Sequence, residues 1–449
     1  MTLATAARVL KAPLQGGDAE FSAVCTDTRK LKRGDLYVAL KGPRFDGHTF
    51  LPEAEKQGAV AALVSLGVTK LPNVRVVDTR LALGDLAAYW RREFSIPVIA
   101  VTGSNGKTTV KNMIAAILAE TGPSLATHGN LNNDIGVPLT LLRLQAGDRY
   151  AVIEMGMNHF GEIDYLTRMT QPTIAVINNA GEAHLAGLGD VANVARAKGE
   201  IFAGLQGNGI AVINADDTYA GLWREMAASR PILTFGLQNR ADISAEFVPD
   251  AVSSLLRLHT PAGDCALRLP LPGKHNVLNA LAAVAATLAA GVKLDDIKAG
   301  LEKLRNISGR LEMKPGCNGA RVWDDTYNAN PASVAAGIEV LRAAEGERVL
   351  VIGDMGELGE AALELHRRTG ERAHQAGIDR LFAVGELSQA AVQAFGENGR
   401  HFPDHEALAA SLSNIMHPRM TVLVKGSRVM QMERVVTGIA AQNTPQRET

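Results

Sequence analysis

Runs of apolar residues alternate with helical stretches through the middle of the chain. Almost every position in these runs is apolar, which is typical of strands buried on both faces of a parallel sheet. The runs lie at residues 96–101, 150–154, 173–178, 209–214 and 231–235. Segments with helical spacing separate them, for example 83–94, 108–120 and 191–202. This alternation predicts a doubly wound parallel sheet.

Two smaller units with the same α/β alternation flank this sheet. The first has predicted strands at 35–40, 59–64 and 74–77 and a helix at 52–58. The last has strands at 321–323, 348–352, 380–384 and 420–424, and helices at 333–344, 361–376 and 429–441. Before it come short alternating strands over 242–271 and an Ala/Leu helix over 276–290. We therefore predict an α/β protein of three domains, at residues 1–82, 83–309 and 310–449.

Composition agrees with a globular enzyme and excludes several other classes. The chain has 449 residues, of which 46% are hydrophobic and 21% charged, so disorder is excluded as the main state. The formal net charge of −1 provides no global basic field, and aromatic residues are only 4%, so we expect no nucleic-acid partner. No stretch is apolar for long enough to predict a signal peptide or a membrane span. The three cysteines are far apart, which favours reduced thiols and a cytoplasmic location.

The strongest local motif lies between a predicted buried strand and a helix. It consists of Gly103, Ser104, Asn105, Gly106, Lys107, Thr108 and Thr109. Glycines at both ends of the turn let backbone N–H groups face an anion, and the helix N-terminus adds partial positive charge. Lys107 can neutralise phosphates, and the Thr108 hydroxyl can bind Mg²⁺. The common form of this loop has a glycine where Val101 stands, which disfavours motor-type ATPases. A glycine-rich turn without a ligand is the alternative interpretation.

Polar residues at the ends of two further strands add a possible metal site. Glu154 ends one strand, while Asn178, Asn179 and His184 follow the next. Because open α/β sheets bind ligands at the carboxyl ends of their strands, a carboxylate and an imidazole could hold a divalent cation there. A hydrogen-bonded structural role is the alternative for His184.

Other candidates have ordinary interpretations as well as functional ones. Lys198 lies on a predicted helix, where a lysine is usually solvated. His275 and Asn276 precede the Ala/Leu helix and could simply cap it. Asp324 and Asp325 follow a strand, where such residues usually form turns but could also bind ribose hydroxyls.

Taken together and in order along the chain, these motifs resemble the Mur ligases of peptidoglycan synthesis. Four segments are most similar to the members that add D-alanyl-D-alanine to UDP-N-acetylmuramoyl-tripeptide: residues 130–138, 325–330, 353–359 and 425–428. The resemblance implies an N-terminal nucleotide-sugar domain, a central P-loop ATPase domain and a C-terminal Rossmann-like domain. It also implies ATP and Mg²⁺ as cofactors, and we expect a monomer.

The resemblance assigns roles position by position. Lys107 and Arg310 would contact phosphate, Asn276 adenine and Asp325 ribose. Thr108, Glu154 and His184 would bind Mg²⁺, together with Lys198, which matches the carbamylated lysine of the family. Near the uridine nucleotide and the other substrate, the matching residues are Asp27, Thr28, Arg29, Asn328 and Asn330. The family often has an acid where this chain has Ala186.

The implied reaction is chemically consistent with these residues. Because a carboxylate resists attack by an amine, the γ-phosphoryl group of ATP first converts it to an acyl phosphate, and an amine then displaces phosphate. We expect domain closure about hinges near residues 83 and 310. Three alternatives remain: a related ligase that adds the third amino acid, folylpolyglutamate synthetase, and a nucleotide-switched binding protein. The N-terminal unit disfavours the folate enzyme, which lacks a nucleotide-sugar domain.

Overall fold

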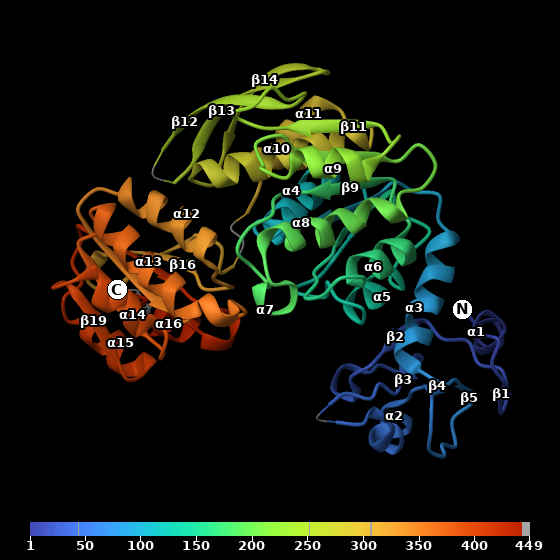
Figure 1. The fold of residues 1–449 in the computed structure, drawn as a ribbon. Coiled ribbons are helices and arrows are strands. Elements are labelled where there is room, and N and C mark those ends of the chain that lie inside the picture. Colours follow the sequence, from blue (N-terminus) through green and yellow to red (C-terminus); the bar gives the residue numbers. More distant parts are fainter. Residues whose placement is uncertain (44, 251, 306–307, 442–449) are drawn as a thin grey trace, which may run out of the picture.

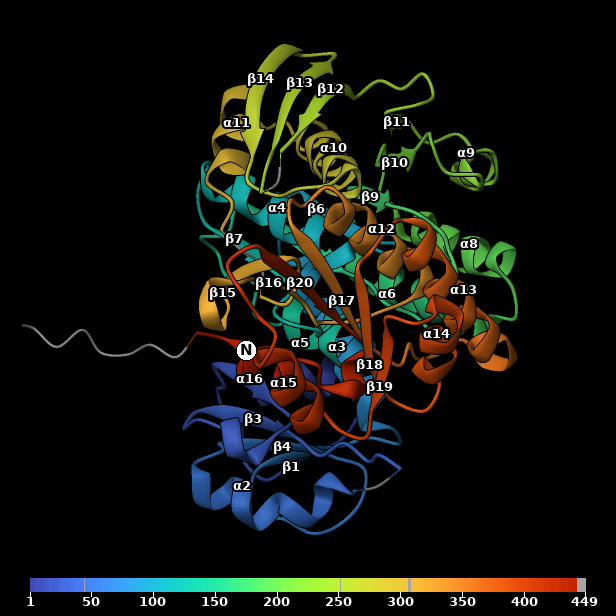
Figure 2. The same cartoon turned by 90° about the vertical axis from the view of Figure 1, so that its left-hand side faces the viewer.

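The computed structural model describes residues 1–43, 45–250, 252–305 and 308–441. They form three α/β bodies, with the central body between the other two (Figure 1). In the view turned by 90°, the N-terminal body lies below and the C-terminal body lies across the front of the central one (Figure 2). The predicted fold class is confirmed.

The central sheet has six parallel strands in the order β11-β10-β9-β6-β8-β7. Alternate residues of β6 face opposite cores. Ile99 and Val101 pack with α4 and α10, while Val98 and Ala100 lie in the core on the other face. Because these strands are buried on both faces, nearly every residue in them is apolar. The strands are β6 (Val98–Thr102), β7 (Ser124–Ala126), β8 (Tyr150–Glu154), β9 (Ile174–Ile177), β10 (Ile210–Asn214) and β11 (Ile232–Phe235).

Helices cover both faces of this sheet, and an antiparallel flank extends it. The helices are α4 (Lys107–Ala119), α5 (Gly136–Leu141), α6 (Glu162–Thr170), α7 (Leu185–Leu188), α8 (Val191–Gly199), α9 (Ala220–Ala227), α10 (Lys274–Ala289) and α11 (Leu294–Glu302). The predicted helix at 191–202 ends early, because residues 200–204 tighten into a 3₁₀ turn. The strands expected within 242–271 are antiparallel: β12 (Ser244–Pro249), β13 (Ser254–Thr260) and β14 (Gly263–Leu269).

The N-terminal body has a five-stranded sheet in the order β1-β5-β4-β3-β2, with only β1 antiparallel to its neighbour. Its elements are α1 (Leu3–Leu10), β1 (Leu14–Gln15), β2 (Ala23–Cys25), β3 (Asp35–Val38), α2 (Leu51–Gln57), β4 (Ala61–Val64) and β5 (Asn73–Arg75). The strand predicted at 74–77 corresponds to β5, which starts one residue earlier and ends two residues earlier. Val77, which was expected in this strand, is fully exposed.

Helix α3 (Thr79–Arg92) joins the first two bodies, so the predicted boundary between residues 82 and 83 lies inside a helix. Leu83 and Leu86 belong to the N-terminal core, whereas Ala87 belongs to the central core. A bend near residue 83 would break helical hydrogen bonds and open both cores. A hinge near residue 83 would have to bend this helix, and it stays a prediction.

The C-terminal body has a six-stranded sheet in the order β15-β16-β20-β17-β18-β19, with only β15 antiparallel. Its strands are β15 (Glu312–Pro315), β16 (Arg321–Asp325), β17 (Glu347–Gly353), β18 (Arg380–Val384), β19 (Gly399–Phe402) and β20 (Met420–Lys425). Its helices are α12 (Pro331–Arg342), α13 (Ala362–Gln375), α14 (Ser388–Phe395), α15 (His405–Ser413) and α16 (Glu433–Ile439). The helix predicted over 429–441 starts later, because residues 428–430 form a 3₁₀ turn.

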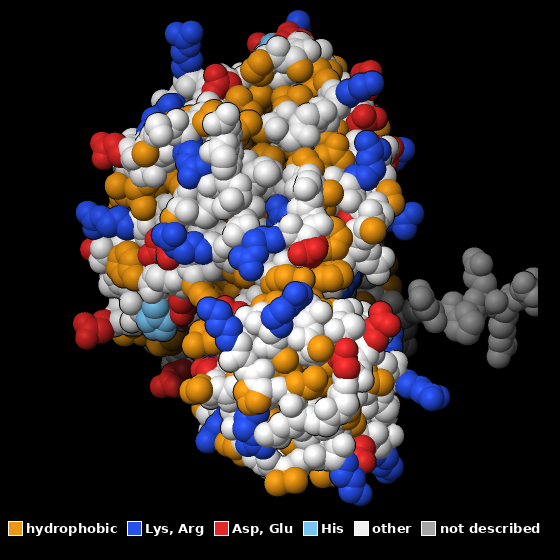
Figure 3. Space-filling view, turned by 90° about the vertical axis from the view of Figure 1, so that its right-hand side faces the viewer, with side chains coloured by type: hydrophobic (Ala, Val, Ile, Leu, Met, Phe, Trp, Pro, Cys, Tyr) orange, Lys and Arg blue, Asp and Glu red, His pale blue; other side chains and the backbone are white. Residues whose placement is uncertain are grey.

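The surface agrees with the near-zero net charge. On the face drawn in Figure 3, basic and acidic side chains are interspersed. Cys25, Cys265 and Cys317 are free thiols. Within the described ranges, no helix is both long enough and apolar enough to cross a bilayer.

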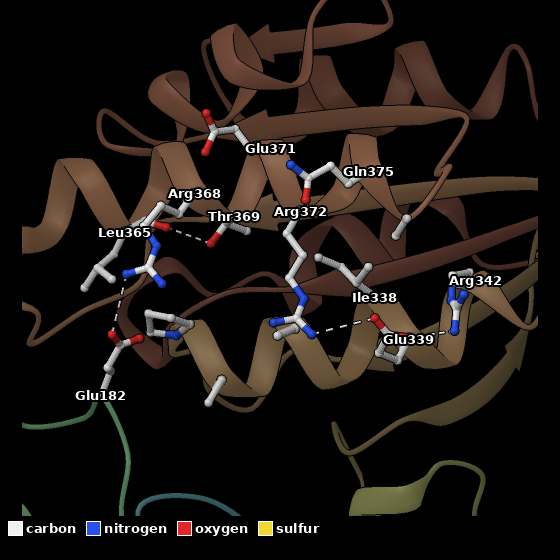
Figure 4. A pocket seen from close by; sticks show the side chains of 14 residues that line it. Glu182, Ile338, Glu339, Arg342, Leu365, Arg368, Thr369, Glu371, Arg372 and Gln375 are labelled. Carbon is white, nitrogen blue, oxygen red and sulfur yellow. Dashed lines mark hydrogen bonds and ion pairs between the residues drawn. The ribbon is translucent and has the colours of Figure 1, made fainter. Parts of the chain in front are cut away.

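A hollow of about 700 Å³ lies between α12 and α13 (Figure 4). Arginines and glutamates alternate along it: Glu339 pairs with Arg342 at 3.0 Å and with Arg372 at 3.7 Å. Arg368 reaches Glu182 of the central body at 3.8 Å. Because the charges are nearly balanced, this hollow has no strong preference for an anion.

Candidate active site

The glycine-rich loop turns from β6 into α4, as predicted. Gly106 has φ 79°, and a Cβ there would collide with Asn279 and Asn178, so a glycine is required at this close approach. Lys107 Nζ lies over the loop and donates to the Gly103 carbonyl oxygen at 2.6 Å. Burial lowers the pKa of Lys107, and the Glu154 carboxylate opposes this effect. The loop thus presents one cation at a helix N-terminus, as a phosphate site requires.

The polar residues after β9 hold this loop in place. The Asn105 N–H donates to Asn179 Oδ1 at 2.8 Å, and the Asn105 carbonyl accepts from Asn178 Nδ2 at 2.9 Å. Ser104 Oγ accepts from the Gly181 N–H at 2.9 Å. The end of β9 thus lies beside the loop, because β9 and β6 are neighbours in the sheet. These bonds fix the backbone of the loop.

Glu154 is the carboxylate best placed to bind a metal. It ends β8 and is 1% exposed. Its Oε1 accepts from Asn132 Nδ2 at 2.8 Å, whereas Oε2 has no hydrogen-bond partner among the described residues. A buried carboxylate oxygen without a donor is costly unless something else binds it. The chemistry of this carboxylate oxygen fits a hard cation such as Mg²⁺, for which the Thr108 hydroxyl at the start of α4 is a second oxygen ligand of the right kind.

His184 contacts the C-terminal domain rather than Glu154. Its Nδ1 lies 2.7 Å from Glu357 Oε2, although the two are not aligned as a hydrogen bond. Both residues have a left-handed backbone, with φ 58° and 62°. Burial lowers the pKa of His184, and the Glu357 carboxylate opposes this effect. In the described part of the chain, no three His, Cys, Asp or Glu side chains converge on one metal position.

Lys198 is not the solvated lysine that its helix position suggested. It is 1% exposed on α8, and among the described residues it makes no hydrogen bond or ion pair. Burial lowers its pKa far below the usual value, and the Lys107 charge lowers it further. Burial thus favours the uncharged amine, the form that reacts with electrophiles.

A cavity of about 280 Å³ lies between the central and C-terminal domains and opens onto the loop. Six residues predicted to bind ATP line it: Asn105, Gly106, Thr109, Asn276, Arg310 and Asp325. Asn276 does not cap α10, because the N-cap is Gly273; instead, Asn276 Nδ2 donates to the Pro272 carbonyl at 2.8 Å. Burial lowers the pKa of His275, in the same wall, to about 4.

The C-terminal domain reaches the loop through two side chains. Arg310 Nη2 donates to Thr108 Oγ1 at 3.4 Å, and its guanidinium stacks 4.2 Å from the Tyr327 ring centre. Asn330 Nδ2 donates to Asn105 Oδ1 at 2.8 Å. The site is therefore made by two domains at once.

The two aspartates after β16 have different partners. Asp325 Oδ2 accepts from Lys425 Nζ at 2.7 Å, and both side chains are buried. Asp324 instead pairs with Lys314 at 2.6 Å and accepts from Thr326, so it does not face the cavity. Of the two, only Asp325 stays a candidate for ribose.

The remaining predicted substrate residues have structural partners. Asn330 caps α12 and contacts the loop, and the Asn328 carbonyl accepts from Lys425 Nζ at 2.9 Å. Asp27 caps the 3₁₀ turn over 28–30, which includes Thr28, and pairs with Arg29 through two hydrogen bonds of 2.9 and 2.8 Å. That motif follows β2 in the N-terminal body, and none of its three residues lines the interdomain cavity. Its substrate role stays a prediction.

Sequence reasoning assigned no role to four residues that the structure places at the site. Asn132 binds Glu154, Glu357 contacts His184, Lys425 pairs with Asp325, and Asn279 lies beside Asn178. Asn132, Glu357 and Lys425 lie in segments on which the resemblance to the family rests, and this position in the sequence is the feature that could have identified them.

A strand–loop–helix phosphate site closed by a second α/β domain defines a P-loop ATP-using enzyme. Sequence profiles of the Mur ligase family match the chain in three parts: the family's catalytic domain at residues 20–91, its middle domain at 101–287 and its glutamate ligase domain at 309–428. The chain belongs to the Mur ligase family and is an ATP-dependent ligase.

Relatives and solved structures agree with this assignment. The chain is 47% identical to UDP-N-acetylmuramoyl-tripeptide–D-alanyl-D-alanine ligase of Escherichia coli, with 99% of each chain covered. It is 41% identical to the ligase of the same name from Haemophilus influenzae, with 96% of each covered. A crystal structure of MurF from Acinetobacter baumannii has a TM-score of 0.91 at 38% identity, covering 97% of each chain. MurF of Thermotoga maritima in complex with ADP has a TM-score of 0.82 at 29% identity, covering 93% of this chain and 96% of that one.

Proposed function

We propose that this chain adds D-alanyl-D-alanine to UDP-N-acetylmuramoyl-tripeptide in the cytoplasm, using ATP and Mg²⁺. The observation that carries the proposal is the interdomain cavity, which six of the predicted ATP residues line and which opens onto the loop that contains Lys107. The identity to ligases with this activity over nearly the whole chain supports the same substrates.

The residues of the site match the needs of an acyl phosphate mechanism. Lys107 bonds to the Gly103 carbonyl of the loop and Arg310 to the Thr108 hydroxyl, and the two side chains would orient the γ-phosphoryl group toward the acceptor carboxylate. Transfer of that group gives an acyl phosphate and ADP. The amine then forms the C–N bond while the C–O bond to phosphate breaks. Because the site is shared by two domains, closing it also excludes water that would hydrolyse the intermediate.

Thr108 and Glu154 would hold Mg²⁺, which neutralises charge on the phosphates when bound. Glu154 contributes the open Oε2 atom while Asn132 holds the other oxygen. His184 would be a ligand of a second ion, through the ring nitrogen that does not face Glu357.

Lys198 is proposed to act as a carbamate. Its buried amine has no hydrogen-bond or ion-pair partner among the described residues, and burial lowers its pKa, so it is suited to add CO₂ and become a carboxylate-like anion that a hard metal prefers. Lys198→Ala should be nearly inactive and partly rescued by acetate or formate, while Lys198→Arg should stay inactive because a guanidinium forms no carbamate. Full activity of Lys198→Arg would contradict the proposal.

Phosphate release distinguishes this function from its rivals. We expect release only when ATP, D-alanyl-D-alanine and a UDP-N-acetylmuramoyl-tripeptide are all present, with the diaminopimelate and lysine tripeptides tested separately. Release with the dipeptide nucleotide and a free third amino acid would instead identify the related ligase. Release that needs neither acid nor amine would indicate a nucleotide switch.

A further inference from the structure

Glu154 is held in one orientation by the segment that follows β7. Its backbone N–H donates to Thr127 Oγ1 at 3.0 Å, and its Oε1 accepts from Asn132 Nδ2 at 2.8 Å. The first bond holds the backbone of Glu154. The second occupies the carboxylate oxygen Oε1 and leaves Oε2 as the open one. The direction in which Glu154 presents a metal ligand therefore depends on where Asn132 lies.

The position of Asn132 is fixed from several sides. Its carbonyl accepts from the Gly156 N–H at 2.8 Å, and a Cβ on Gly156 would lie 3.0 Å from the Asn132 side chain. A Cβ on Gly136 would collide with the Leu131 backbone, so the turn after Asn132 is tight. The buried Lys111 of α4 donates to the Thr127 carbonyl at 2.9 Å and ties the segment to the helix of the phosphate loop.

The same segment also contacts the N-terminal domain. Asn133 Oδ1 accepts from the Gly136 N–H at 2.9 Å and so holds the start of α5. Asp134 pairs with Arg80 near the start of α3, at 2.6 Å. One short stretch of chain thus joins the domain expected to bind the nucleotide sugar to the carboxylate expected to bind the metal.

We propose that Asn132 is a positioning residue for the metal site: its amide holds Glu154 Oε1 so that Oε2 points toward the cation. Without this amide, the carboxylate can rotate or pair with a neighbouring lysine. Outer partners of metal ligands typically change metal affinity by about 10–100-fold. The inference rests on the proposed Mg²⁺–ATP site but not on which peptide is joined.

Metal binding without turnover tests this role. Mn²⁺ would be titrated into the full-length protein with a non-hydrolysable ATP analogue and followed by electron paramagnetic resonance. Asn132→Ala and the volume-conserving Asn132→Leu should both weaken Mn²⁺ binding about 10-fold or more. Asn130→Ala is the matched control, because Asn130 is an exposed amide in the same segment. Melting temperatures report whether each variant folds.

Each outcome bears on the proposal. Weakened Mn²⁺ binding in folded Asn132 variants, with Asn130→Ala like the parent protein, supports it. Unchanged Mn²⁺ affinity in either folded Asn132 variant overturns it, and so does failure of both variants to fold, which would make Asn132 a residue of the fold alone. If the parent protein itself binds no Mn²⁺, the proposed metal site fails, which is a separate result from an unaffected variant.

Discussion

Removal of the Asp325 carboxylate should affect both the fold and the nucleotide, and the two effects can be separated. Asp325 and Lys425 pair at 2.7 Å, with side chains only 11% and 2% exposed. Asp325→Ala leaves the Lys425 ammonium buried without its counter-ion, because its other bond is to the neutral Asn328 carbonyl. Breaking a buried pair from one side costs about 3–5 kcal/mol. We expect the C-terminal domain to lose about that much stability.

The double variant Asp325→Ala, Lys425→Met removes both charges and should recover most of the lost stability. If Asp325 also binds ribose, the KM for ATP stays raised in the double variant while the KM for D-alanyl-D-alanine changes little. Urea unfolding of the parent protein, Asp325→Ala and the double variant, with steady-state kinetics of the stable ones, measures both effects. A fully stable Asp325→Ala would refute the argument from the buried pair. An ATP KM that recovers together with stability would place the ribose elsewhere.

Two further predictions concern the phosphate loop and the cavity wall. Lys107→Ala should lower turnover by about 10²-fold or more with the fold intact, because a loop cation that stabilises transferring phosphate is lost; near-normal turnover at saturating ATP would contradict the assignment. His275 has a pKa of about 4 in the folded protein because burial disfavours its charged form. Since its unfolded pKa is about 6.5, the unfolded chain binds the extra proton, and stability is lost as the pH falls from about 6.5 to 4, by about 3 kcal/mol in total. His275→Gln should remove this part of the acid sensitivity, as measured by urea unfolding at pH 7 and 4.5, and an unchanged acid loss would contradict it.

The long central strands could be predicted because a continuous apolar run between helical segments indicates a strand that is buried on both faces. The runs at 150–154 and 380–384 coincide with β8 and β18, since both faces of each strand are buried. A short strand has too few residues to show a periodic pattern of apolar positions. The strand β7 has three residues, and it forms by pairing with β8, which its own sequence does not reveal. The start of α3 could have been found, because Asp78 accepts hydrogen bonds from the Arg80 and Leu81 N–H groups, as an N-cap does.

In the candidate site, too, contacts between residues close in the sequence could be predicted, whereas contacts between distant residues could not. The loop from Gly103 to Thr109 is a contiguous motif whose chemistry is local, so its geometry followed from the sequence. Arg310 and Thr108 are 202 positions apart, and Asn330 and Asn105 are 225 apart. Such pairs depend on how two domains dock, which no single segment encodes. The burial of Lys198 was missed for the same reason, because neighbouring helices rather than its own sequence cover it.

One close contact at the joint between the N-terminal and central domains gives a last prediction. Gly84 lies in α3, and a Cβ there would collide with the Tyr165 hydroxyl of α6. Alanine normally stabilises a helix by about 1 kcal/mol relative to glycine, whereas overpacking costs about 1–3 kcal/mol. Gly84→Ala should therefore destabilise the protein. In a Tyr165→Phe background the nearest atoms become the flexible end of Met169 at 3.0 Å and the ring Cζ of residue 165 at 3.1 Å, so the same change should be less destabilising than with Tyr165 present. Urea unfolding of the four proteins measures the coupling, and a Gly84→Ala variant that gains stability with Tyr165 present would show that α3 is not packed tightly between the two domains.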